Sequence, residues 1–74
     1  MTVLFGVYRA VVKANLDPEG RRRLRVEVPG ALSDDTWATP GVPGAGDALP
    51  TVGSTVWVTF ERGDPSIPLW ISAG

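Results

Sequence analysis

The stretch that decides the fold class is residues 49–65, which read LPTVGSTVWVTFERGDP. In its centre, Val56, Val58 and Phe60 occupy alternate positions. Gly, Pro and Asp flank this segment on both sides, and these residue types favour turns. A period of two between turn signals is typical of a β-strand with one buried face. We therefore predict a strand over 55–61 whose aliphatic face points toward a core.

Three further segments predict strands on either side of this one. Residues 3–14 are apolar on both parities, which indicates a long strand with a twist or bulge. The Asp-Pro-Glu-Gly run at 17–20 forms a turn, because Pro presets φ and Gly accepts positive φ. Residues 21–28 alternate cleanly and are predicted to form a hairpin with the first strand. Residues 67–72 form a short last strand. The side chains predicted to fill the core are Leu24, Val26, Val56, Val58 and Phe60, with Leu69 and Ile71 also directed inward.

A long connection, residues 29–50, separates the second strand from the central one. It is rich in Gly, Pro, Asp and Ala, and it holds one short island at 36–38. We expect Trp37 to anchor this connection to the rest of the fold. Four or five strands, one long mid-chain loop and no helix predict an all-β, five-stranded Greek-key barrel. The OB-fold and the SH3-like barrel both fit this pattern.

Length and composition exclude several classes of protein. Seventy-four residues make one domain, 1–74, with a thin core. The chain has no Cys and no His, so it lacks disulfides, thiolate metal sites and the commonest general base. The serines have only Lys13 as an unusual base. We therefore predict no enzyme activity, no catalytic residues, no cofactor and no metal, and oligomerisation remains as the means to stabilise a small fold.

Charge and hydropathy argue against two further partners. The formal net charge is −1, which gives no general attraction to nucleic acid or to an anionic membrane. No stretch approaches the 18 apolar residues of a membrane span, and the N-terminal residues lack the basic region of a signal peptide. We expect synthesis in a cytoplasm, no stable membrane insertion and no nucleic-acid partner.

The tryptophans are candidate interface residues. Trp57 and Trp70 lie on the parity opposite the aliphatic residues of their strands, so both rings are expected to point outward. Exposed Trp is typical of an interface, since its ring buries a large area on contact. The alternative is that the long connection folds back, with Trp37, and covers both rings.

An arginine cluster lies at the start of the second strand. Arg21, Arg22, Arg23 and Arg25 are four of the seven basic residues. One interpretation is a phosphate-contacting patch of a single-strand binder, which needs aromatic side chains on the same face. Arg23 and Arg25 share their face with Glu27 rather than with an aromatic residue. The other interpretation is a solvated hairpin end, or ion pairs with a neighbouring subunit.

Two smaller patterns receive no functional interpretation. Gly46, Gly53 and Gly63 match no phosphate-binding spacing, and no helix follows them, so we interpret them as turn glycines. Asp34 and Asp35 are adjacent acids, but no further carboxylate lies near them in sequence. We expect a solvated turn at this position rather than a cation site.

The order of motifs carries a resemblance to a known family. The chain shows DPEGRRRLRVEVP at 17–29, WATP at 37–40, PGAG at 43–46, the 49–65 stretch quoted above, and PLWI at 68–71. This order resembles the OB-fold domain of phage baseplate central-spike proteins, which also occurs in VgrG spikes of type VI secretion and related contractile injection systems. The resemblance covers roughly residues 5–74.

The resemblance implies a structural role. It predicts a homotrimeric connector in a virion or injection-particle baseplate, placed between a tail hub protein and a separate spike or needle protein. Because the sequence contains only the barrel, hub and needle are expected on other chains, or the sequence is an excised piece of a longer spike protein. Two alternatives stay open: an OB-fold module that binds single-stranded nucleic acid through the Arg21–Arg25 hairpin, and an SH3-like adaptor for proline-rich peptides.

Overall fold

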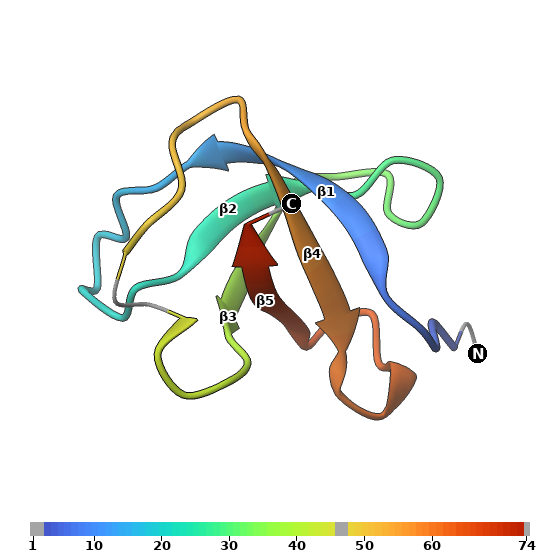
Figure 1. Ribbon diagram of the computed structural model, residues 1–74. Coiled ribbons are helices and arrows are strands. Elements are labelled where there is room, and N and C mark those ends of the chain that lie inside the picture. The colour runs from blue at the N-terminus through green and yellow to red at the C-terminus, as the bar shows by residue number, and fades with distance from the viewer. Residues whose placement is uncertain (1–2, 46–47, 74) are drawn as a thin grey trace.

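The computed structural model describes residues 3–45 and 48–73, which form a closed five-stranded barrel (Figure 1). The strand order around the barrel is β1-β2-β3-β5-β4, and β4 pairs back onto β1. All pairs are antiparallel except β3 with β5. This arrangement confirms the predicted all-β barrel and has the strand order of an OB-fold. The elements are β1 (Tyr8–Ala14), β2 (Leu24–Glu27), β3 (Thr36–Pro40), β4 (Thr55–Phe60), the 3-10 turn η2 (Glu61–Gly63) and β5 (Pro68–Ala73).

Two predicted segments differ from the structure. The island at 36–38 is the beginning of β3, so the predicted long connection contains a strand that pairs with both β2 and β5. The first strand begins only at Tyr8, and residues 3–7 lie outside the sheet. The bulge predicted for this strand is confirmed by the register shift between Val12 and Ala14.

The barrel interior holds five of the seven side chains predicted to point inward, namely Leu24, Val26, Val56, Val58 and Phe60. The buried side chains come from all five strands, which is how a small barrel fills its centre. The buried apolar residues are Ala10, Val12, Leu24, Val26, Val28, Ala38, Val56, Val58, Phe60 and Trp70.

The prediction for Trp70 was wrong, because its side chain points inward. The ring is only 1% exposed, whereas Leu69 and Ile71 are half-buried on the outer side of β5. Trp70 lies directly opposite Val58 in the β4–β5 ladder, and residues opposite each other share a face of the sheet. Since Val58 faces the interior, Trp70 does so as well. Its indole N–H donates to the carbonyl of Arg22 at 3.3 Å, so the buried donor is satisfied.

The polar groups of the described residues are compatible with this apolar interior. No buried side-chain nitrogen or oxygen in residues 3–45 and 48–73 lacks a hydrogen-bond partner. No helix in the same part of the chain is long and apolar enough to cross a membrane.

Candidate functional site

The β1–β2 connection is organised by the carboxylate of Asp17. The backbone N–H groups of Glu19, Arg21 and Arg23 donate to it, and the Arg23 guanidinium adds two donors at 2.8 and 3.0 Å. The Asp17 side chain is only 3% exposed. The hydrogen bonds from the Arg23 side chain, with those from the backbone, hold the pKa of Asp17 well below its usual range. The charge of Asp17 is therefore satisfied within the turn.

Two arginines of the cluster lie over the ring of Trp37. The sequence analysis did not expect this contact. Arg25 of β2 lies opposite Trp37 of β3, and the guanidinium carbons of Arg23 and Arg25 lie 5.2 and 5.9 Å from the centroid of the Trp37 ring. Arg25 also approaches Asp35 at 3.9 Å, so this acid is paired rather than simply solvated. The expectation that no aromatic residue accompanies these arginines was wrong, because the aromatic comes from the neighbouring strand.

Arg21 and Arg22 do not join this stack. Arg21 is exposed and lies 3.4 Å from the carboxylate of Glu19. Arg22 is exposed and has a φ of 61°, and its carbonyl is the one that accepts the indole N–H of Trp70. Its backbone carbonyl therefore satisfies a buried core residue, while its side chain has no ion pair among the described residues. The four arginines do not form one uniform cationic patch.

Trp57 lies on the outer wall of the barrel, as predicted. It is half-buried on β4, and the guanidinium carbon of Arg9 on β1 lies 5.1 Å from its ring centroid. Leu69 and Ile71 are half-buried on the outer side of the adjacent strand β5. This wall is amphipathic, since aliphatic groups and a cation–π pair occupy it together.

The N-terminal arm, residues 3–7, lies against the turn between β4 and β5 (Figure 1). The Gly63 backbone is buried beneath the arm, and a Cβ built there would come within 2.6 Å of Val3 and 2.9 Å of Phe5. Glycine is therefore required for this close approach, and its φ of +74° also favours glycine. Three hydrogen bonds hold the arm: Leu4 N–H to Gly63 O at 2.7 Å, Thr59 Oγ1 to Gly6 O at 3.0 Å, and Tyr8 Oη to Phe5 O at 2.9 Å.

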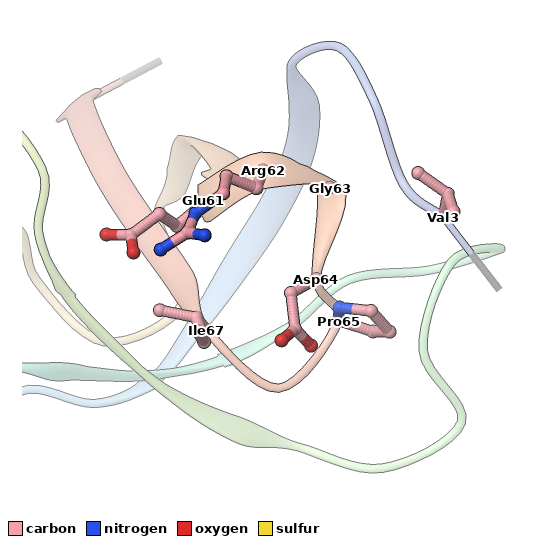
Figure 2. Close-up of a pocket in the computed structure, with 7 residues that line it drawn as sticks. All are labelled: Val3, Glu61, Arg62, Gly63, Asp64, Pro65 and Ile67. Atoms are coloured by element: carbon pink, nitrogen blue, oxygen red, sulfur yellow. The ribbon is translucent and has the colours of Figure 1, made fainter. Parts of the chain in front are cut away.

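A hollow of about 650 Å³ opens beside this contact, lined by Val3 of the arm and by residues of the turn. Figure 2 shows Val3 on the arm side and the residues of the turn, among them Arg62 and Ile67, on the other. The carboxylate of Asp64 at its edge accepts hydrogen bonds from the backbone N–H and hydroxyl of Ser66, which lower the pKa of Asp64. The sequence analysis assigned the arm to a strand and missed this hollow. The only signal was Gly6, which interrupts the apolar run.

The remaining candidate positions fall in turns where the structure describes them. Gly53 and Gly63 have φ of +91° and +74°, as expected of turn glycines, and Gly46 lies outside the described residues. Asp34 is exposed. Among residues 3–45 and 48–73, no three His, Cys, Asp or Glu side chains gather in a way that could hold a metal ion.

Comparison with known proteins supports the resemblance noted in the sequence. The family model described as the type VI secretion system/phage-baseplate injector OB domain matches residues 8–73, from the start of β1 to the end of β5. None of the curated proteins compared with the chain matched it. A family match over nearly the whole barrel, together with the OB strand order, settles the family. The chain belongs to the type VI secretion system and phage-baseplate injector OB-domain family.

Proposed function

We propose that this chain is a homotrimeric connector between the tube hub and the needle of a phage tail or contractile injection particle. The observation that carries this proposal is the family match over residues 8–73, since that family is a structural domain of baseplate injectors. Hub and needle are then separate partner proteins that contact opposite ends of the barrel. The chain acts in the particle baseplate after synthesis in the cytoplasm of the producing bacterium.

The closed barrel suits a part that carries load without chemistry. Each strand is paired on both sides, so the sheet leaves no open edge to slip or to recruit other strands. The interior is filled by apolar side chains from every strand, and tightly packed interiors transmit strain rather than absorb it. Association adds stability by mass action, which compensates for the thin core of a chain of 74 residues.

Light scattering of the purified chain across a dilution series tests the proposal. A mass of three chains that persists on dilution is expected. A single chain at every concentration contradicts the homotrimer. A stable assembly of another size contradicts the threefold symmetry but leaves the family assignment untouched.

One observation supports the nucleic-acid alternative and another argues against it. Arg23 and Arg25 do lie beside an aromatic ring, as a single-strand binder requires. The two guanidiniums, however, lie over the Trp37 ring where a base would stack, and both also contact carboxylates, Arg23 that of Asp17 and Arg25 that of Asp35. We expect no binding of single-stranded DNA at low salt in a filter-binding assay. Tight binding that weakens steeply as salt is added favours the alternative.

A further inference from the structure

The apolar surface left open by this fold is at the N-terminal arm rather than at the tryptophans. Trp70 is buried, and guanidinium groups lie over the rings of Trp37 and Trp57. Seven large apolar side chains are exposed in the described part of the chain, and four of them lie on the arm or on the adjoining turn. We call these four, with the hollow beside them, the arm patch; they are Val3, Phe5, Val7 and Ile67.

The arm patch is held in shape before any partner arrives. Hydrogen bonds fix the arm at Leu4, Phe5 and Gly6, and the Val3 and Phe5 side chains rest on the buried backbone of Gly63. A surface ordered in advance loses little conformational entropy on binding. An exposed apolar cluster that is also ordered is typical of a contact surface, because scattered mobile apolar groups would not need such support.

The patch offers both a projection and a recess. The Phe5 side chain is 73% exposed although the backbone on either side of it is hydrogen-bonded. Next to it, the hollow of about 650 Å³ has apolar walls from Val3, Pro65 and Ile67 (Figure 2). An exposed aromatic ring and an apolar recess on one chain are the two halves of a contact that copies of the chain can make with each other.

The charges around the hollow favour the same occupant. Glu61 and Asp64 are acidic and Arg62 is basic, and all three line the hollow. No ion pair within the described residues uses any of them. A rim that carries both signs is complementary to itself, whereas a rim of one sign would select a partner of the opposite charge.

We infer that the arm patch is the contact between copies of this chain, with Phe5 of one copy seated in the hollow of its neighbour. This inference rests on the proposed homotrimer and names the surface that holds it together. The proposed contact lies at the arm and the β4–β5 turn, whereas the sequence analysis had named Trp37, Trp57 and Trp70 as candidate interface residues.

A charge placed on the projection tests the inference. Phe5→Asp introduces a carboxylate into the proposed contact, and Leu16→Asp is the matched control, because Leu16 is 84% exposed on the β1–β2 connection away from the arm (Figure 1). Sedimentation velocity across a dilution series is expected to show Phe5→Asp weakening association by about 30-fold or more. Leu16→Asp is expected to associate like the wild type, and circular dichroism confirms that both variants fold.

Crosslinking locates the contact independently. The chain has no Cys, so each introduced thiol is unique. Chains carrying Phe5→Cys are mixed with chains carrying Ile67→Cys and oxidised, so that a disulfide between the two variants joins different copies. We expect this pair to crosslink faster than Leu16→Cys mixed with Ile67→Cys.

The outcomes separate this inference from the proposed function. If the wild type is a trimer and Phe5→Asp remains one, the inference is wrong and another surface holds the trimer together. If the wild type forms an assembly other than a trimer and Phe5→Asp dissociates it, the inference holds and the proposed trimer is wrong. A wild type that stays monomeric at every concentration overturns both.

Discussion

The β1–β2 connection and the arm patch use opposite means to order a segment outside the barrel sheet. In the connection, the carboxylate of Asp17 accepts hydrogen bonds from backbone N–H groups and from the guanidinium of Arg23, so these two charges are neutralised inside the chain. In the arm patch, a buried glycine supports apolar side chains that remain exposed. The connection leaves Leu16 as its one exposed large apolar side chain, whereas the arm patch gathers four such side chains at one place. This difference is the reason to place the proposed contact between copies of the chain at the arm.

The largest expected effect comes from Trp70, which joins the β1–β2 connection to the core through its bond to Arg22. Trp70→Ala is expected to lower the free energy of unfolding by about 3–5 kcal/mol, most of the stability of so small a domain. Trp57→Ala, on the outer wall, is the matched control and is expected to cost less. Urea denaturation measures both, and equal losses would contradict the inward position of Trp70.

Two glycines allow the two regions to be compared directly. Gly20 in the connection and Gly63 beneath the arm both have positive φ, but a Cβ would meet nothing within 4 Å at Gly20. Gly20→Ala is expected to cost about 1 kcal/mol for its backbone conformation alone. Gly63→Ala is expected to cost about 2–3 kcal/mol, because its Cβ must also displace the arm.

The measurement for this pair is again urea denaturation, combined with sedimentation velocity. Gly63→Ala is expected to weaken self-association together with stability, since it moves Val3 and Phe5. Gly20→Ala is expected to leave self-association unchanged. If both variants lose the same stability, the arm is not seated on Gly63 in solution.

A third effect is confined to acid pH. The pKa of Asp17 is lowered in the folded chain, so its carboxylate stabilises the fold above the unfolded carboxyl pKa of about 3.9. That contribution is lost as the pH falls below this value through the lower pKa of the folded state. Thermal unfolding between pH 5 and pH 2 is expected to show a shallower decline for Asp17→Asn than for the wild type.

Asp64 is the matched control for the acid titration, because its pKa is also lowered, chiefly by the hydrogen bonds from Ser66 and to a smaller extent by the charge of Arg62. Asp64→Asn is expected to flatten the acid decline less than Asp17→Asn. A larger change for Asp64→Asn would mean that the turn beside the arm, rather than the β1–β2 connection, depends on its charges.

The smallest effect is expected on the barrel wall between the two regions. Lys13 and Glu27 form an ion pair of 3.7 Å between half-exposed side chains. Lys13→Gln is expected to change the free energy of unfolding by less than about 0.5 kcal/mol. This variant is the baseline for the urea measurements above. If Lys13→Gln lowers the free energy of unfolding by more than Gly20→Ala does, the Lys13–Glu27 ion pair contributes more stability than its exposure indicates.

The sequence was sufficient for the fold class and for most of the core. Alternation fixed the inward faces of β2 and β4, because one parity in each was clearly aliphatic. In β5 both parities were apolar, and preference for Leu69 and Ile71 over Trp70 gave the wrong face. The register against β4 decides this face, and register between distant strands cannot be obtained from composition.

The candidate site was less predictable for the same reason. The contact of Arg25 with Trp37 depends on the pairing of β2 with β3, so a search along one strand found no aromatic partner. The arm was assigned to a strand because apolar residues on both parities were interpreted as a barrel strand with a bulge. Its apolar side chains instead lie outside the sheet, where no pattern in residues 3–7 reveals the glycine that supports them.

The pairing of β1 with β4 has a consequence for the making of the particle. These strands lie on either side of the middle of the chain, so β1 keeps one unpaired edge until β4 has left the ribosome and folded against it. Non-local pairings of this kind fold slowly and expose strand edges to neighbouring chains in the meantime. The chain is therefore most exposed to aggregation while it is still being synthesised, before β4 has paired with β1.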